Sequence, residues 1–396
     1  MRINLAYGDE NTKFKRPKFK IIFIICIIIL IIASIGSSIY FYIFNEQFKG
    51  FVDKYIFVKE ISSENLKFIS LDDSNSKYIK SYNKYIITIE KGKLEAYNSK
   101  AKKVFELDIN INNPLIEIKN DVLIIAENKG QKLYYISNND IKWEKELEGE
   151  ILSLHINKNG YVAVILRNTN YKSIIITFDN KGKELFKTWL GKTYAVDVDI
   201  SNDNKYLAFA EVNTNGSTIR SNIKIISIDK AIKNEEDSYI YTYNDITESL
   251  IISIKFQDKN KLICMYNSRI DVIQNNNCEV FLEMSLKDSL FVDVKLDNTV
   301  LKANKMSTGL FATQTELTLI NTNTKKEYKY TVNGTPKNIY TYKNLIAIDI
   351  GTEIHFINTK GWLIKRYSNN REAKDIVLGN DIGGIIYKDK IELLNL

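Results

Sequence analysis

One hairpin pattern recurs eight times in this sequence and leaves few folds open to it. Each copy has an extended segment, a polar turn rich in Asn, Asp, Gly or Lys, and an apolar strand. These turn residues tolerate the left-handed backbone that tight hairpins require. The copies lie at 78–89, 116–126, 154–165, 198–210, 254–265, 294–303, 340–350 and 376–387. The pattern predicts an all-β fold without a long amphipathic helix in this region.

A second hairpin follows most copies, and its turn has the form Asn/Asp-x-x-small-Lys-x-x-aromatic. Clear examples begin at Asn98, Asp179 and Asn321. We expect the aromatic residue to pack between neighbouring sheets. The aromatics at this position are Phe105, Phe186 and Tyr328, and Trp143 takes the same place at a shorter spacing. Two hairpins per repeat give four antiparallel strands.

Four-stranded repeats of about 40–45 residues are typical of β-propeller blades. Residues 66–396 accommodate eight blades of this size, and seven is the alternative if one weak unit is irregular. The last unit, 371–396, has room for three strands only. We expect segment 66–71 to supply the fourth, which closes the ring by pairing the two ends of the domain. The longest unit carries an insertion near 232–238 that we interpret as a polar loop.

A run of 24 uncharged residues, 21–44, precedes the repeats. As a helix it would be about 36 Å long, enough to cross a hydrocarbon core of about 30 Å. Five cations lie in 13–20, so the positive-inside rule predicts a cytoplasmic tail over 1–20. Residues 45–65 then form a juxtamembrane stalk, and 66–396 form an extracytoplasmic domain. The small residues of 34–38 suggest a cleaved signal peptide instead, but the run is longer than such a core. We therefore expect an uncleaved, single-pass anchor that contacts the lipid bilayer of the cell membrane through 21–44.

Charge and cysteine usage exclude several classes of protein. The net charge is +7, of which +4 lies in residues 1–20, so no basic face for nucleic acid is predicted in the domain. Of three cysteines, Cys26 lies in the apolar run, and Cys264 and Cys278 are the others. A whole predicted strand separates Cys264 from Cys278, which disfavours a disulfide between them.

Recognisable catalytic motifs are missing from the sequence. The two histidines, His155 and His355, lie in different repeats. A zinc site needs three or four clustered ligands, so no metal is expected. Neither a nucleophile elbow nor a phosphate-binding glycine loop is present. We expect neither a cofactor nor an enzymatic activity.

Polar residues on the innermost strands form one suggestive constellation. Asp197 and Asp199 alternate with apolar residues, so both carboxylates lie on one face of a strand. In a propeller that face lines the central channel. Comparable positions in other repeats hold His155, Lys255, Asp293 and Asp375. Three interpretations stay open: hydrogen bonds between blades and to channel water, a site for a ligand or cation, or a carboxylate pair for glycoside hydrolysis.

The repeats resemble two kinds of known propeller. The second-hairpin turn is similar to the Asp-x-x-x-Gly-Lys-x-x-Trp docking motif of quinoprotein (PQQ)-like propellers, with Phe or Tyr in place of Trp. Residues 160–225 resemble a bacterial family of single-pass, membrane-anchored propellers of unknown function, built on quinoprotein-like or WD40-like repeats. The resemblance implies architecture and topology but no activity. A PQQ-dependent dehydrogenase would need stronger Trp motifs than three Trp residues provide.

The sequence therefore favours a membrane-anchored, extracytoplasmic propeller. Its expected function is a non-enzymatic binding or scaffold module for a protein partner or a cell-envelope component. The alternative is an extracytoplasmic enzyme that acts on a glycan or small molecule through the inner-strand carboxylates.

Overall fold

The computed structural model forms two compact units, Met1–Val58 and Lys59–Leu396. It describes residues 18–45, 48, 52, 60–61, 66–71, 78–245, 249–285, 289–307, 313–380 and 382–395. The first unit holds helix α1 (Lys18–Phe44). Its stretch Phe23–Phe44 is long and apolar enough to cross a membrane, and its large apolar side chains are exposed. A soluble helix would bury such side chains, which fits the predicted span.

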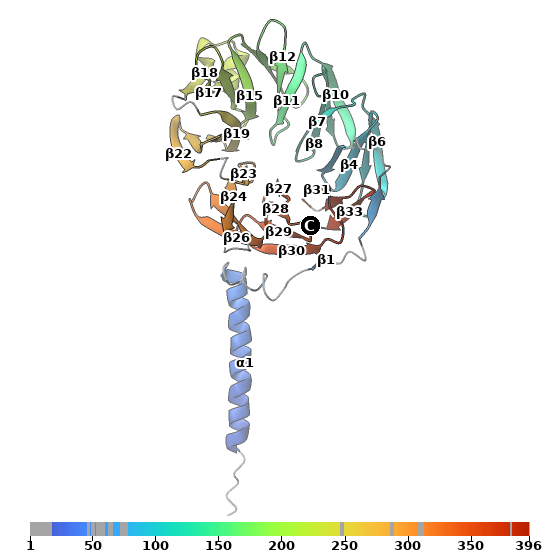
Figure 1. Cartoon of the computed structure of the whole chain (residues 1–396), viewed down its shortest axis with the longest axis vertical. Helices are drawn as coiled ribbons and strands as arrows, with labels where there is room; N and C mark the ends of the chain where they lie inside the picture. The colour runs from blue at the N-terminus through green and yellow to red at the C-terminus, as the bar shows by residue number, and fades with distance from the viewer. Residues whose placement is uncertain are drawn as a thin grey trace, which may run out of the picture. The chain divides into compact units, whose positions relative to one another are not determined.

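The second unit is a ring of eight blades, each built on four antiparallel strands (Figure 1). Blade 1 holds β3 (Tyr78–Tyr82), β4 (Tyr85–Glu90), β5 (Lys93–Tyr97) and β6 (Lys103–Asp108). Blade 2 holds β7 (Pro114–Lys119), β8 (Val122–Glu127), β9 (Lys132–Ser137) and β10 (Asp140–Glu146). Blade 3 holds β11 (Glu150–Ile156), β12 (Val162–Arg167), β13 (Ser173–Phe178) and β14 (Glu184–Leu190). Blade 4 holds β15 (Thr193–Ile200), β16 (Tyr206–Asn213), β17 (Arg220–Ser227) and β18 (Tyr239–Asn244).

The remaining blades continue the same order from the inner strand to the outer strand. Blade 5 holds β19 (Ile251–Asp258), β20 (Lys261–Tyr266), β21 (Arg269–Gln274) and β22 (Asn277–Glu283). Blade 6 holds β23 (Phe291–Asp293), β24 (Thr299–Ser307), β25 (Thr313–Asn321) and β26 (Glu327–Asn333). Blade 7 holds β27 (Asn338–Tyr342), β28 (Leu345–Asp349), β29 (Glu353–Asn358) and β30 (Leu363–Ser368). Blade 8 holds β31 (Asp375–Val377), β32 (Ile382–Ile386), β33 (Lys390–Asn395) and, from the other end of the domain, β2 (Phe68–Ser70).

The two ends of the domain close the ring, as the sequence predicts. Strand β2 pairs antiparallel with β33, with Ile69 opposite Ile391. The count of eight blades is confirmed, and seven is excluded. A further strand, β1 (Glu60–Ile61), adds in parallel to the outer edge of β30. This short strand lies inside the segment that the sequence analysis treats as a stalk.

Apolar side chains fill the space between every pair of successive blades. Eight buried clusters each combine residues of two neighbouring blades, and the last joins blade 8 to blade 1. The middle strands are buried on both faces, because each blade packs against a neighbour on either side. The core is therefore a closed circle of interfaces, in which each blade depends on two others.

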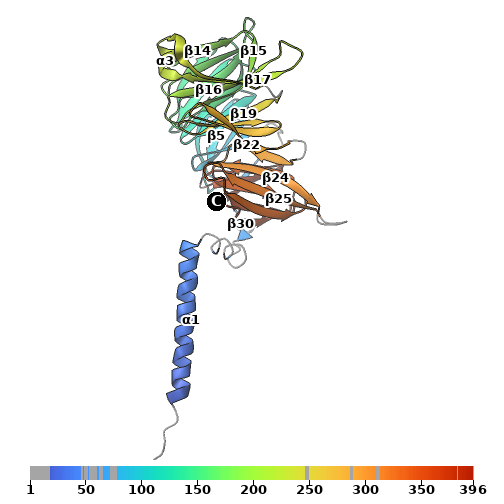
Figure 2. The same cartoon turned by 90° about the vertical axis from the view of Figure 1, so that its left-hand side faces the viewer.

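The insertion in blade 4 differs from the predicted polar loop. It contains helix α3 (Ile228–Ile232) and a 3₁₀ turn, η2 (Glu236–Ser238). Helix α3 lies beside β14 of blade 3 (Figure 2). Ile228 is buried in the cluster between these blades. That burial fixes the helix that leads into the predicted insertion, and the polar composition of the insertion itself does not indicate it.

The second-hairpin turns owe their composition to backbone geometry. Asp179 Oδ1 accepts hydrogen bonds from the backbone N–H groups of Lys181 and Lys183, at 2.9 and 2.8 Å. Gly182, the small residue of the motif, has a φ of +80°. Such a turn needs a capping oxygen at its first position and a residue that tolerates positive φ at its fourth.

Trp143 lies at the interface between blades 2 and 3. Its ring stacks on Tyr135 at a centroid distance of 4.7 Å, and its Nε1 donates to the carbonyl of Asn180 at 3.3 Å. Phe105, Phe186 and Tyr328 pack against the clusters between blades 1 and 2, 3 and 4, and 6 and 7, respectively. All four aromatics therefore lie between neighbouring sheets.

Gly182→Ala is expected to destabilise the domain by about 1–2 kcal/mol, the cost of a left-handed backbone for an L-residue. The added Cβ would also lie 2.9 Å from the Trp143 ring. Urea unfolding followed by tryptophan fluorescence measures the effect. Gly191→Ala is the matched control, because a Cβ there meets no atom within 4 Å. Equal effects at the two positions would contradict this account of the turn.

Candidate functional site

The inner strands surround a central channel that contains a cavity of about 590 Å³. Strands β7, β11, β15, β19 and β27 contribute to its wall. Four of the six predicted site residues line this cavity: His155, Asp197, Asp199 and Lys255. Asp293 and Asp375 are not among the lining residues.

Asp197 and Asp199 of β15 both reach across to β19 of the next blade. Asp197 Oδ2 accepts the backbone N–H of Ile254 at 2.9 Å, and Asp199 Oδ2 accepts that of Phe256 at 2.7 Å. Innermost strands of different blades share no ladder of hydrogen bonds, so their N–H groups need other acceptors. The two carboxylates therefore join blade 4 to blade 5, in agreement with the interpretation of inter-blade hydrogen bonding.

His155 of β11 extends this connection to blade 3. Its Nε2 lies 2.5 Å from Asp199 Oδ1, and a quarter of its side chain is exposed. Burial opposes the charged imidazolium, but the Asp199 carboxylate outweighs it and raises the pKa of His155. Burial also raises the pKa of Asp197 to about 6, against the effect of its backbone hydrogen bonds. The channel wall thus holds two groups whose pKa values are raised above their ordinary values.

The remaining carboxylates also form contacts between blades. Asp293 Oδ2 accepts the hydroxyl hydrogen of Thr341 in blade 7 at 3.0 Å. Asp375 of blade 8 lies near the Tyr340 hydroxyl of blade 7, and burial together with the Asp375 charge raises the pKa of Tyr340. Each of these carboxylates contacts a residue of an adjacent blade, but the four inner-strand carboxylates do not line one common cavity.

Lys255 of β19 points along the same wall and donates from Nζ to the backbone carbonyl of Lys295. Burial, and then the charge of Lys119, lower its pKa to about 8. Lys119 of blade 2 and Lys255 of blade 5 thus bring two positive charges to the same channel cavity.

Asp197→Asn should change how stability depends on pH. The folded-state pKa of Asp197 lies above its unfolded value, so ionisation costs stability in full above about pH 6. That cost falls away as the pH drops from 6 towards 4. The wild type should therefore gain stability relative to the Asn variant over this interval, measured by urea unfolding at each pH. Protonation of His155 also stabilises the folded state, because its folded-state pKa is raised as well. That stabilisation is lost as the pH rises through the folded-state pKa of His155. A constant difference from pH 7 to pH 4 would contradict this assignment.

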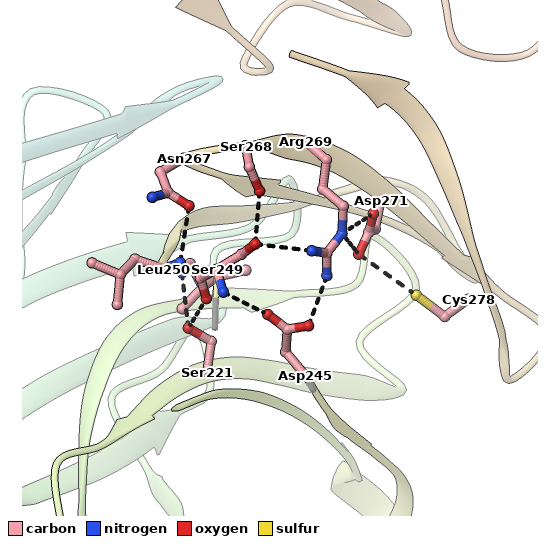
Figure 3. Close-up of polar contacts among 10 residues, drawn as sticks. Ser221, Asp245, Ser249, Leu250, Asn267, Ser268, Arg269, Asp271 and Cys278 are labelled. Atoms are coloured by element: carbon pink, nitrogen blue, oxygen red, sulfur yellow. Dashed lines mark hydrogen bonds and ion pairs between the residues drawn. The ribbon is translucent and has the colours of Figure 1, made fainter. Parts of the chain in front are cut away.

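A second polar cluster, which sequence reasoning missed, lies between blades 4 and 5 (Figure 3). The Arg269 guanidinium is 7% exposed and contacts two buried carboxylates. Its Nε lies 2.9 Å from both oxygens of Asp271, and its Nη2 lies 3.0 Å from Asp245 Oδ1. Burial raises the pKa of Asp271 despite the guanidinium. The available signal was Arg-x-Asp on a strand whose other residues, apart from Gln274, are apolar, in a chain with few arginines.

Serine hydroxyls complete the Arg269 cluster and connect it to the backbone. Arg269 Nη1 donates to Ser249 Oγ at 3.0 Å, and Ser221 Oγ donates to the Ser249 carbonyl at 2.7 Å. Cys278 Sγ lies 4.0 Å from Asp271 Oδ2. Cys264 and Cys278 are both free thiols, as the intervening strand β21 predicts. The cluster is closed to solvent, which suits a clamp between blades.

A family model matches residues 59–396, which is the whole of the propeller unit. Its description is a family of unknown function (DUF5711). The chain belongs to this family. No curated protein sequence matches the chain. Family membership agrees with the predicted resemblance in fold and adds no activity.

Solved structures of several propellers are similar to this DUF5711 chain. BamB from Moraxella catarrhalis has a TM-score of 0.51 at 13% identity, and the match covers 86% of this chain and 100% of that one. The C-terminal WD40 domain of Sif2 has a TM-score of 0.55 at 13% identity, covering 86% and 99%. Sqt1 from Chaetomium thermophilum has a TM-score of 0.51 at 10% identity, covering 83% and 97%. At these identities the likeness concerns the fold alone.

Proposed function

We propose that this protein is a non-enzymatic binding or scaffold module that is anchored in the cell membrane. Helix α1 forms the single span, and the cations of 13–20 keep the N-terminus in the cytoplasm. The propeller is then extracytoplasmic and holds a protein partner or a component of the cell envelope.

One observation carries the proposal. The strongest candidates for acid–base chemistry, Asp197 and Asp199, are both occupied by backbone N–H groups of β19. Residues that hold two blades together are poorly placed to exchange protons with a substrate. Similar folds in the solved propellers support a rigid scaffold of this kind.

Chemical cross-linking in membranes, followed by purification of the full-length protein, tests the proposal. A variant that keeps only the tail and span is the control. We expect one extracytoplasmic partner or envelope component to be recovered with the full-length protein and not with the control. Turnover of a glycan or small molecule that Asp197→Asn/Asp199→Asn abolishes without unfolding would overturn the proposal in favour of the enzyme alternative.

A further inference from the structure

The inner hairpin turns surround one mouth of the channel, and a second cavity of about 400 Å³ lies there. Lys119 at the end of β7, Lys158 of the β11–β12 turn and Lys255 of β19 all line it. The cavity shares Lys119, Lys255 and Asp297 with the larger channel cavity, so the two volumes adjoin. A volume of this size falls within the range of about 300–1,000 Å³ that small-molecule sites occupy.

The wall of this mouth cavity carries an excess of positive charge. Three lysines line it together with a single carboxylate, that of Asp297. Within the part of the chain that the structure describes, none of the three ammonium groups has a carboxylate at ion-pair distance. Lysines without a carboxylate partner are common on open surfaces, but here lysines from three blades line one concave site.

Neutral polar residues line the cavity as well. Asn202, Asn298 and Asn344 are among them. Gln257 lines it too, and its Oε1 accepts the hydroxyl hydrogen of Thr322. The Nε2 of Gln257 is buried without a partner among the described residues. Among the charged groups, three ammonium donors face a single carboxylate acceptor, which suits an anionic ligand that only accepts hydrogen bonds.

Electrostatics at Lys255 lead to the same conclusion. Burial and the charge of Lys119 lower the pKa of Lys255, while Asp297, Asp199 and Asp293 act in the opposite direction. Burial is the larger cause, and the charge of Lys119 comes second. An anion in the mouth would stabilise the ammonium form of Lys255 and offset the charge of Lys119.

We propose that the mouth cavity binds a phosphate group. A phosphate monoester carries about −1.5 to −2 charge at pH 7, close to the excess of three lysines over one aspartate. Its oxygens accept hydrogen bonds from ammonium and amide groups, and lysine is an established phosphate ligand. Free phosphate has this charge, and the phosphodiester of an envelope polymer offers the same acceptor oxygens with a single negative charge per phosphate. The inference rests on the proposed binding function, because it names the ligand class of that module.

Isothermal titration calorimetry on the full-length protein in a phosphate-free maltoside detergent tests this site. The probes are inorganic phosphate, dimethyl phosphate as a diester, and succinate as a dicarboxylate. We expect saturable binding of phosphate that Lys119→Gln/Lys158→Gln weakens by about tenfold or more, since two charge-assisted bonds are lost. Lys205→Gln is the matched control, because Lys205 is exposed in the β15–β16 turn outside the cavity wall.

Each outcome bears on the site. Binding of both phosphate probes supports it and indicates a phosphodiester source, and binding of inorganic phosphate alone supports it and indicates the free ion. The inference is wrong if the wild type shows no saturable binding, if the control variant loses as much affinity, or if succinate binds as tightly. If phosphate fails to bind but cross-linking still recovers a partner, only this inference fails. If bound phosphate esters are hydrolysed, the non-enzymatic proposal fails and the site stands.

Discussion

Arg269→Met is expected to lower the free energy of unfolding by about 3–5 kcal/mol, the usual cost of breaking a buried ion pair. The substitution leaves the carboxylates of Asp245 and Asp271 buried without their counter-charge, since their side chains are 0% and 1% exposed. It also removes a cation from above the Tyr266 ring, 4.4 Å from its centroid. Urea unfolding of the full-length protein measures the loss.

Two further variants make the Arg269 result specific. Arg269→Met/Asp245→Asn/Asp271→Asn removes all three charges and should recover most of the stability, because neutral residues can replace a buried ionic triad. Arg371→Met breaks a pair with Asp389 whose side chains are 62% and 64% exposed. That change should cost less than about 1 kcal/mol. Equal losses for Arg269→Met and Arg371→Met would refute the role of the buried cluster.

Ile69→Asp is expected to cost about 4 kcal/mol or more, the range reached when an unpaired charge is buried. Ile69 lies in β2, is 5% exposed, and packs in the cluster between blades 8 and 1. A carboxylate there opposes the pairing of β2 with β33, so the ring should open at this seam. Urea unfolding gives the energy, and hydrogen exchange should show faster exchange in β33.

Phe68→Asp provides the matched control for closure of the ring. Phe68 precedes Ile69 in the same strand, but its side chain is 54% exposed. It lies near Lys390, whose Nζ is 5.6 Å from the ring centroid, so a carboxylate is tolerated there. We expect a change within about 0.5 kcal/mol, as for most surface substitutions. A loss as large as that of Ile69→Asp would mean that β2 contributes by another route.

The strands and the ring closure could be predicted because their signals are local. An inner hairpin needs an apolar strand and a turn that tolerates positive φ, and the inner turns repeatedly place Asn there, as at Asn83, Asn120 and Asn298. Eight such turns at regular spacing leave little choice of fold. The fourth strand of the last blade could be predicted because segment 66–71 is strand-like and precedes the first complete repeat.

The partners of the candidate site residues could not be predicted in the same way. Asp199 meets Phe256 57 residues further along the chain, and Arg269 meets Asp245 across a blade interface. Alternation along a strand predicts the face on which a side chain lies, but not its neighbour on the next blade. The parallel addition of β1 to β30 was missed for the same reason, since two residues carry no periodicity.

Local sequence patterns alone determined that this chain forms strands, how they group into blades, and that an apolar helix precedes them. They could do so because hairpin turns and periodicity act over a few residues. Only the tertiary structure decided that the inner carboxylates hold blades together, that Arg269 is buried between two aspartates, and that three lysines share one mouth. Those contacts depend on the angle between successive blades, which arises when the whole ring closes.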